Sequence, residues 1–567
     1  MKQRSKKNQV LFTLIGLSIP LLFFGLIEGS LRLVGVGQPA PLFIDNPVHP
    51  DYQLPRPDIL TRYFPPSAQA PNVTLEANFL LKDKPDNGFR VFVQGGSTAA
   101  GYPYGMGASL AGMLDHRLKA SLPGRYVEVV NTALSAVNSF TLLDIADEII
   151  EQAPDAVVIY AGHNEFLGIL GVGSNYTLGS HYALTRSMLW LKDFNTYQLL
   201  QRAIYSGFEQ TNDTPSSQRR TVMSQVAKHK DIALDSEIFS QGIVQFERNM
   251  SALLNKYQAA GIPVFISTIA SNLRDQPPFS SEPIPQAFTQ AIKTVSSLSE
   301  TKTLATQWKT SDSAALHFQI AQKLYQYQSF EDAKYHFIKA KELDLLRFRA
   351  PEAINQVIKR LAKNKGVYLV DAEQQMLARS EGNIVGNNLM LEHLHPNVPG
   401  YFIIADSVYQ GLMQSGLFRP WQNISTNTAW KRRPLLPAEE YFGYASVLTL
   451  MADYPFTDSP QPVSLPAPAD WQQELGLLQF KKQIDWLTMT KRSAERYQLA
   501  RDTHMHVKAL QLIADALPHD PIANVAAGEA LFKAKRREES MFYLLRAQRA
   551  GDVTPSTKQL LRQLRSQ

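Results

Sequence analysis

The sequence predicts an α/β fold, with a parallel sheet covered by helices on both faces, and two observations lead to it. Between residues 89 and 411, short apolar runs alternate with amphipathic segments of helical length. One of these runs, Ala156 to Tyr160, is apolar throughout, which is typical of a strand buried on both faces of a parallel sheet. Because strands and helices alternate along the chain, we expect βαβ units stacked in three layers.

The expected elements follow one another in order. The strands are Arg90–Gln94, Tyr126–Val130, Ala156–Tyr160, Pro263–Ile269 and Val367–Val370. The helices are Gly107–Ala120, Thr141–Gln152, Phe239–Ala260, Pro351–Asn364 and Pro399–Gly411. In open parallel sheets, ligands bind beyond the carboxyl ends of the strands, so functional side chains are expected in the loops that follow them.

An apolar segment near the N-terminus predicts a membrane anchor. Val10 to Ile27 is apolar apart from Thr13 and Ser18, and about 18–20 apolar residues span a hydrocarbon core of roughly 30 Å. The basic residues upstream predict an N-terminus that stays in the cytoplasm and a chain that continues outside it; they are Lys2, Arg4, Lys6 and Lys7. A cleaved signal peptide and a buried helix of a soluble protein are the alternatives, although no Ala-x-Ala cleavage site follows the segment.

The composition excludes several classes of function. The net charge is +6, without a basic stripe that carries interleaved aromatic residues, so no nucleic acid is expected as a partner. The chain has 0 cysteines, which excludes disulfides, thiolate metal sites and a cysteine nucleophile. With 567 residues, 44% of them hydrophobic, the chain is long enough for several domains with sizeable cores.

These patterns divide the chain into five regions. We expect a membrane anchor at 1–30, a proline-rich linker at 31–88, the α/β domain at 89–415, a connecting region at 416–490 and a helical domain at 491–567. A helical insertion interrupts the α/β domain at about 285–345. The prolines between residues 38 and 75 favour an extended linker that lifts the remainder off the membrane.

The insertion and the C-terminal region share a spacing of small residues. The insertion carries Ala321, Ala333, Phe337 and Ala340, and the same separations recur at Gly528, Ser540, Leu544 and Ala547. This spacing matches the tetratricopeptide helix–turn–helix. Ordinary amphipathic helices with small residues at their crossings are the alternative. Stacked helical pairs usually offer a concave surface to a protein partner, so such a partner is expected here.

Four short polar segments lie at the ends of the expected elements. They are Gly95-Gly96-Ser97-Thr98 after the first strand, Asn131 to Ala136 with Ala133 after the second, Gly162-His163-Asn164-Glu165 after the third, and Glu392 to Asn397 with His395 near the end of the unit. A serine, a small residue, an asparagine and a histidine in this order resemble the four sequence blocks of the SGNH/GDSL hydrolase family. The resemblance covers about Phe89 to Gly411, and it is closest to the extracytoplasmic branch that carries tetratricopeptide-like helices.

Ser97 is the candidate nucleophile. Ester cleavage needs an oxygen nucleophile, a base that takes its proton and donors for the oxyanion. Ser97 stands between a strand and a helix, after two glycines that permit a tight turn. A plain turn in which Ser97 or Thr98 caps the helix is the alternative for this tetrapeptide.

The resemblance implies a three-layer, flavodoxin-like hydrolase domain and a role for each block. It implies His395 as the base, Glu392 as the residue that orients it, and an oxyanion hole formed by the Asn164 side chain with the backbone amides of Ser97 and Ala133. Two residues depart from the family pattern, since Ala133 replaces a glycine and Glu392 replaces an aspartate. Either carboxylate can hold the neutral imidazole tautomer.

The implied activity is hydrolysis or transfer of an acyl ester through an acyl-Ser97 intermediate, with no cofactor and no metal. The expected substrates are acylated polysaccharide or lipid of the cell envelope, and the expected location is outside the cytoplasm on a single-pass anchor. A sugar hydroxyl as acceptor would make the protein an O-acyltransferase. The other hypothesis is a degenerate SGNH-like scaffold whose helical repeats bind an envelope partner; Ala133 and Glu392 keep it open.

Further alternatives and weaker candidates concern the same loops. Tyr102 and Tyr104 follow the serine and are candidates for stacking on a sugar ring, with core packing as the alternative; Glu165 is a candidate for a substrate contact. His393 competes with His395, and both could bind a metal together with His163, although no acidic cluster or cysteine supports this. The segment from Gly95 also half-resembles the Gly-x-Ser-x-Gly elbow of α/β-hydrolases.

Overall fold

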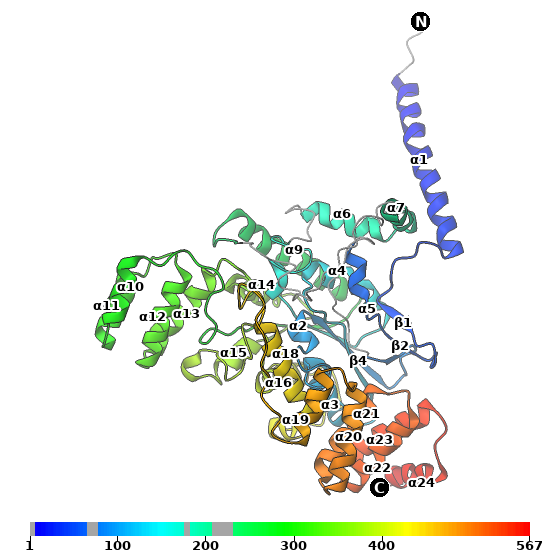
Figure 1. The fold of residues 1–567 in the computed structure, drawn as a ribbon. Helices are drawn as coiled ribbons and strands as arrows, with labels where there is room; N and C mark the ends of the chain where they lie inside the picture. The colour runs from blue at the N-terminus through cyan, green and yellow to red at the C-terminus, as the bar shows by residue number, and fades with distance from the viewer. Residues whose placement is uncertain (1–5, 65–77, 175–181, 207–230, 567) are drawn as a thin grey trace. The chain divides into compact units, whose positions relative to one another are not determined.

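The computed structural model describes residues 6–64, 78–174, 182–206 and 231–566 of the 567-residue chain (Figure 1). The chain divides into two compact units. The first contains residues 1–42, 58–72 and 181–219, and the second contains 43–57, 73–180 and 220–567. Each unit is described separately below.

A five-stranded parallel sheet forms the centre of the second unit. Its strands are β4 (Gly88–Gly95), β5 (Tyr126–Asn131), β6 (Ala156–Tyr160), β7 (Val264–Ser267) and β8 (Val367–Val370). Their order is β5-β4-β6-β7-β8, and every neighbouring pair is parallel. This order is that of the flavodoxin-like doubly wound fold. The predicted parallel sheet is therefore confirmed, and two of its strands, β6 and β8, have the bounds expected from the sequence.

Helices cover both faces of this sheet. On one face, α3 (Leu110–Ser121) packs against α16 (Val398–Gln414). On the other face, α9 (Glu237–Ala259) contacts α4 (Ser139–Asp144), α5 (Ala146–Glu151) and α14 (Glu352–Leu361). The helix predicted for Thr141–Gln152 is interrupted, because Ile145 has a ψ of 0°, outside the helical range. The remaining short elements of the domain are α2 (Ser97–Ala100), η2 (His163–Glu165), α15 (Ala372–Leu377) and η3 (Glu381–Asn383).

Polar residues in the sequence set the starts of these helices. Ser109 precedes α3, and its hydroxyl accepts a hydrogen bond from the amide of Gly112 at 3.0 Å. Asn397 precedes α16 and accepts in the same way from Gly400 at 3.0 Å, with Pro399 in the first turn. Such caps satisfy amide groups that have no partner inside the helix.

The region from 31 to 88 is not the extended linker that was predicted. It contains a three-stranded antiparallel sheet of β1 (Phe43–Asp45), β2 (Tyr52–Pro55) and β3 (Leu80–Leu81). The side chains of Tyr52 and Leu81 pack against Tyr126 of the α/β domain. The sequence did not predict this sheet, because its strands are short and far apart along the chain. The prolines between them suggested an extended segment instead.

Helical hairpins make up the insertion and the C-terminal region. In the insertion, α10 (Gln286–Thr294) and α11 (Leu298–Gln307) precede the pair α12 (Ala314–Gln326) and α13 (Phe330–Glu342). The C-terminal helices are α17 (Thr426–Lys431), α18 (Pro437–Met451), α19 (Trp471–Phe480), α20 (Trp486–Leu499), α21 (Thr503–Ala516), α22 (Pro521–Lys533), α23 (Arg537–Ala550) and α24 (Pro555–Ser566). Figure 1 shows α12 beside α13 in green and α22 beside α23 in orange to red.

The small residues singled out in the sequence lie where these helices cross. Ala321, Ala333 and Ala340 are buried in one cluster between α12 and α13. At the equivalent place between α22 and α23, the hydroxyl of Ser540 donates to the carbonyl of Gly528 at 2.7 Å. The tetratricopeptide identity of these hairpins stays a prediction.

The first unit consists of α1 (Lys6–Val34), η1 (Ile59–Tyr63), α6 (Tyr182–Lys192) and α7 (Asn195–Ser206). Within the described residues, one stretch is long and apolar enough to cross a membrane: Leu14–Val34 of α1, with a mean hydropathy of 1.9. A membrane anchor and a signal sequence both have this length and composition.

Candidate active site

Ser97 is the first residue of α2 and directly follows the turn after β4. The backbone passes very close to its neighbours here. A Cβ on Gly95 would lie 2.1 Å from the carbonyl oxygen of Tyr160. A Cβ on Gly96 would lie 2.8 Å from Nδ2 of the Asn164 side chain. Glycine is therefore needed at both positions to bring Ser97 beside the end of β6. The side chain of Ser97 is half-buried at the carboxyl end of the sheet.

His395 lies against this serine, although the two residues are 298 positions apart in the sequence. Its Nε2 is 2.7 Å from the Ser97 hydroxyl oxygen. The loop that carries His395 is fixed to α2, because the hydroxyl of Thr98 donates to the carbonyl of Leu394 at 3.3 Å. The predicted proximity of serine and imidazole is thus found in the structure.

Glu392 holds the opposite side of this imidazole. Its Oε1 contacts Nδ1 of His395 and also accepts from the backbone amide of His395 at 3.1 Å. Its Oε2 accepts from the amide of Leu394 at 3.2 Å. Burial alone would raise the pKa of Glu392, but the two imidazoles of His393 and His395 outweigh burial and hold this pKa well below its usual range. Glu392 is therefore a carboxylate in the folded protein.

His393, which the sequence suggested as a competitor of His395 or as a metal ligand with it, adjoins the same carboxylate. Its Nδ1 contacts Oε2 of Glu392, so both histidines share one carboxylate. The ring is enclosed by Phe279, Phe348 and Phe456, at centroid distances of 5.2, 6.0 and 5.4 Å. Burial, partly opposed by Glu392, lowers the pKa of His393. A neutral His393 therefore donates from Nδ1 to Glu392, and its Nε2 has no hydrogen-bond partner among the described residues.

Asn164 lies beside Gly96, the residue before the serine, whereas the amide of Ala133 is bonded elsewhere. The side-chain amide of Asn164 donates to the carbonyl of Val137 at 3.0 Å and has a second N–H beside Gly96. The amide of Ala133 donates to the side chain of Asn131 at 3.1 Å, so it is committed elsewhere. Three residues on, Ala136 has a left-handed backbone with a φ of 65°, and its amide has no acceptor among the hydrogen bonds of the described residues.

Two of the three predicted substrate contacts are turned into the protein. Glu165 is 1% exposed, and its carboxylate accepts from the hydroxyl of Ser139 at 2.8 Å and from Gln245 at 2.6 Å. Burial raises the pKa of Glu165 to about 7. Tyr104 is 7% exposed and packs on Tyr401. These residues are not placed to contact a substrate, because each completes a buried cluster.

Tyr102 is the tyrosine that remains at the site. Its ring centroid lies 4.7 Å from that of His395, at an angle of 54°. Its hydroxyl donates to the carbonyl of Ser446 on α18 at 3.4 Å. Tyr102 therefore packs on the face of the imidazole, and its half-buried side chain borders the surface beside Ser97.

The three histidines considered as metal ligands have other contacts. Nδ1 of His163 accepts from the amide of Ala350 at 3.2 Å, and burial lowers the pKa of His163 to about 3. His393 and His395 both contact Glu392 through Nδ1. In the described part of the chain, no group of three histidine, aspartate or glutamate side chains has the arrangement of a metal site.

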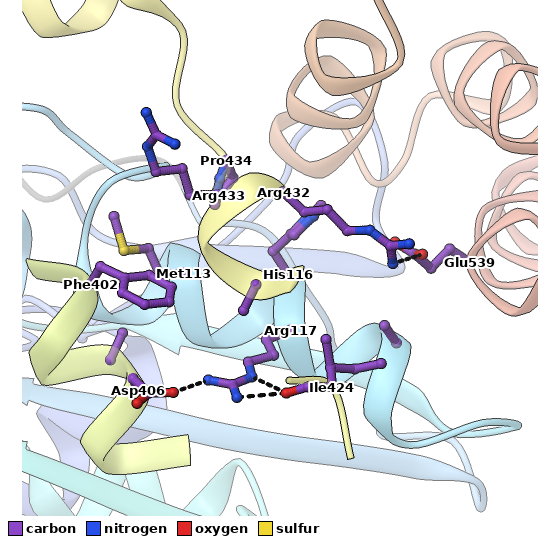
Figure 2. Close-up of a pocket in the computed structure, with 13 residues that line it drawn as sticks. Met113, His116, Arg117, Phe402, Asp406, Ile424, Arg432, Arg433, Pro434 and Glu539 are labelled. Carbon is purple, nitrogen blue, oxygen red and sulfur yellow. Dashed lines mark hydrogen bonds and ion pairs between the residues drawn. The ribbon is translucent and has the colours of Figure 1, made fainter. Parts of the chain in front are cut away.

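A hollow whose lining does not include Ser97 lies beside α3 and α16 (Figure 2). Four of its charged residues form two pairs. Arg117 donates to Asp406 and, at 2.6 Å, to the carbonyl of Ile424, while Arg432 donates to Glu539 at 3.0 Å. Because these side chains hold one another, we do not assign a substrate to this hollow.

The doubly wound sheet and the Ser97–His395–Glu392 arrangement at its carboxyl edge have the geometry of a Ser-His-acid hydrolase. No protein-family model matches the chain, and no curated protein matches it.

Solved structures similar to this chain include a lipase and two esterases. A GDSL-like lipase from Bacteroides thetaiotaomicron is 12% identical, with 57% of this chain and 88% of that chain covered and a TM-score of 0.27. The psychrotrophic esterase EstA from Pseudoalteromonas is 12% identical, with 57% and 97% covered and a TM-score of 0.26. An acetylxylan esterase from Geobacillus stearothermophilus is 12% identical, with 59% and 96% covered and a TM-score of 0.27. At such identities, the similarity concerns the fold and not the activity of this chain.

Proposed function

We propose that this protein is a serine ester hydrolase of the SGNH/GDSL type that acts through an acyl-Ser97 intermediate. The single observation that carries the proposal is the 2.7 Å contact between the Ser97 hydroxyl and Nε2 of His395. At this distance the imidazole can take the hydroxyl proton directly. The charged Glu392 on Nδ1 fixes the tautomer in which Nε2 is free to do so.

The reaction would proceed in two displacements. Ser97 attacks the ester carbonyl while His395 takes its proton, and the tetrahedral intermediate then expels the alcohol, which receives that proton. A water molecule next attacks the acyl-Ser97 ester with His395 again as base, and the acid leaves as Ser97 regains its proton. Glu392 stabilises the imidazolium that forms in each half of the reaction.

The oxyanion would be held by three donors. They are the side-chain amide of Asn164, the backbone amide of Ser97 and the backbone amide of Ala136 in place of that of Ala133. The segment of Ala136 is joined to that of Asn164, because the amide of Ile169 donates to the carbonyl of Ala136 at 2.7 Å. Each such donor contributes roughly 100- to 1000-fold in rate in other enzymes.

The replacement of aspartate by Glu392 is compatible with this scheme. The longer side chain could swing away from the imidazole, but two backbone amides, those of Leu394 and His395, hold its two oxygens. A third donor, His393, occupies Oε2. These contacts support an active hydrolase rather than the degenerate scaffold.

For location and substrate, we propose a single-pass anchor with the hydrolase domain outside the cytoplasm, acting on acyl esters of envelope polysaccharide or lipid. The retention of α1 is supported by its contacts in the first unit. Glu28 on α1 accepts from the amides of Asn195 and Thr196 at 3.0 and 2.9 Å. A signal peptide that is cleaved makes no such contacts with the mature chain. The helical hairpins are the proposed site for a protein partner.

The test uses the full-length chain in detergent with p-nitrophenyl acetate and a fluorophosphonate probe. We expect turnover and a single covalent adduct, mapped by mass spectrometry to Ser97. Ser97→Ala should remove both, with a rate loss of at least about 1000-fold. Ser135→Ala, which removes a neighbouring half-buried hydroxyl, is the matched control and should keep both.

Two results would contradict the proposal. An adduct that persists in Ser97→Ala would place the nucleophile elsewhere. A wild-type chain that is folded but neither turns over ester nor takes up the probe would favour the scaffold. Transfer of the acetyl group from acyl-Ser97 to sugar hydroxyls, measured by mass spectrometry of added oligosaccharides, would distinguish transfer from hydrolysis.

A further inference from the structure

Helices α6 and α7 form a hairpin that is built onto the apolar helix α1. Glu28, 7% exposed although it lies on α1, accepts from the amide and hydroxyl of Thr196 at 2.9 and 2.8 Å. Arg32, one turn further on, donates to the carbonyl of Asp193 at 3.1 Å. Beyond the end of α1, the side chain of Asn195 donates to the carbonyl of Val36 at 2.8 Å. The turn of the hairpin is therefore fixed along the last part of α1.

Aromatic rings continue this contact into the apolar part of α1. Phe194 in the turn lies 5.5 Å from Phe24 of α1, measured between ring centroids. Trp190 of α6 lies 4.7 Å from Phe194 on its other side. Phe24 lies within Leu14–Val34, the stretch of α1 that is long and apolar enough to cross a membrane. The turn of the hairpin therefore contacts the apolar span itself.

The hairpin exposes large apolar side chains in the first unit. Trp190 is 60% exposed and Leu184 is 49% exposed, and both are on α6. Leu200, on α7, is 57% exposed. The exposed positions of α6 recur at helical spacing and carry no charge; they are Ala183, Leu184, Ser187, Trp190 and Leu191. Soluble surfaces rarely gather such side chains on one face, so this face has a partner.

We propose that the α6–α7 hairpin lies in the lipid bilayer interface, with the apolar face of α6 and Leu200 inserted beside the anchor. The proposal rests on the membrane anchor of the proposed function. The occupant is lipid rather than protein because the face is continuous with the apolar span itself, through Phe24, Phe194 and Trp190. A tryptophan at the rim of such a face is typical of the headgroup level.

The hairpin also carries basic residues, which indicate the kind of lipid. Arg186 on α6 is half-buried and Arg202 on α7 is exposed. Cations beside an apolar face favour anionic headgroups, because electrostatic attraction adds to the burial of apolar area. The hairpin would thus give the chain a second contact with the membrane. It begins about 150 residues after the end of the anchor helix.

The absence of cysteine from the sequence allows a direct test with single cysteines. Leu184→Cys and Trp190→Cys are each labelled with an NBD fluorophore in the full-length chain. The chain is reconstituted into vesicles of equal parts phosphatidylcholine and phosphatidylglycerol, with nitroxide lipids as quenchers. Leu17→Cys within the span is the positive control, and Ile522→Cys, 79% exposed on α22, is the aqueous control.

We expect NBD emission at residues 184 and 190 to be blue-shifted and to be quenched several-fold more strongly than at residue 522, with shallow nitroxides more effective than deep ones. Quenching as weak as at residue 522 would overturn the proposal. So would a blue shift without quenching, since it would mean a protein partner or a second copy. If Leu17→Cys is not quenched either, the anchor itself fails, independently of the hydrolase activity of Ser97.

Discussion

Among single residues, Glu392 has the most unusual surroundings, because one buried carboxylate receives two imidazoles and two backbone amides. Only His395 reaches Ser97. His393 points away from the serine into a cluster of phenylalanines. We therefore infer that His393 positions Glu392, and acts on the reaction only through it.

Replacing His393 should separate this positioning role from simple packing. His393→Phe fills the aromatic cluster but removes the donor to Glu392, and we expect kcat/KM to fall by roughly tenfold or more, since a hydrogen bond to a charged group contributes about 1.5–3 kcal/mol. His393→Asn keeps an N–H at the place of Nδ1 and should restore most of the rate. The measurement is ester turnover by both variants, with thermal unfolding followed in parallel.

A contrary result for His393 would be equal loss in the two variants. If His393→Asn is as slow as His393→Phe, the donor does not matter and the histidine serves packing alone. Equal rates in both variants and the wild type would show that the backbone amides suffice to hold Glu392.

The residues of the site that the sequence predicted are those marked by spacing. Ser97 follows two glycines after a strand, and Glu392 stands three residues before His395, so local order was enough to find them. Ala136 could not be found in this way, because the role we propose for it depends on a positive φ and on an amide without an acceptor, which its side chain does not reveal. A glycine at this position would have suggested a positive φ. Glu165 was misread because burial, not sequence position, decides which way it points.

At the scale of elements, the helical pair α12 and α13 contains a hydrogen bond with only one possible direction. Nε2 of His317 lies 2.9 Å from the carbonyl of Ser311, which can only accept, so Nε2 carries the proton. Nδ1 of a neutral His317 must then accept from Nδ1 of His336, at 2.8 Å. A proton added to His317 would make both of its ring nitrogens donors, so the bond between the helices would last only if His336 moved its own proton from Nδ1 to Nε2.

This pair should make the insertion sensitive to acid. Burial lowers the pKa of His317, and burial together with His317 lowers the pKa of His336 to about 4. Since unfolded histidine titrates near pH 6.5, the unfolded chain binds more protons between about pH 6.5 and 4, and stability falls as the pH falls through this range. Hydrogen exchange of the α12 and α13 amides, corrected for intrinsic rates, should speed up between about pH 7 and 5.

His317→Gln is the control for the acid effect. Its side chain can accept from His336 but cannot take a proton, so the loss of protection on acidification should shrink. The neighbouring charges, Lys309, Asp332 and Lys339, are unchanged in this variant. If both proteins lose protection equally, protonation of His317 is not the cause.

Helices and strands could be predicted where their apolar residues follow a regular pattern in the sequence. The strands β6 and β8 were found with correct bounds because each is a short run flanked by polar turns. The sheet β1-β2-β3 was missed, because β1 and β3 have three and two residues and are stable only through packing on the domain. Long-range pairing of this kind leaves no periodicity in the sequence.

For the second unit as a whole, buried ion pairs connect the sheet domain to the C-terminal helices. Lys119 on α3 forms ion pairs with Asp115 on its own helix and, at 2.6 Å, with Asp515 on α21. Asp515 also accepts from Arg546 at 3.0 Å and from the Tyr543 hydroxyl at 2.9 Å. The side chain of Lys119 is only 6% exposed. We infer that these buried charges join the hydrolase-like domain and the C-terminal helices into one cooperative unit.

Lys119→Met should therefore destabilise both parts together. The variant keeps most of the side-chain volume but removes the cation that Asp115 and Asp515 share. Breaking a buried ion pair costs about 3–5 kcal/mol, and because Arg546 still pairs with Asp515, we expect a loss near the lower end of this range. Lys82→Met, which removes the exposed pair with Asp45, is the matched control and should cost no more than about 1 kcal/mol. Denaturant unfolding gives the free energies, and hydrogen exchange locates the loss. Faster hydrogen exchange in both α3 and α21 would agree with one cooperative unit. Faster exchange confined to α19–α24 would mean that the C-terminal helices unfold separately, because Lys119 would then stabilise only them.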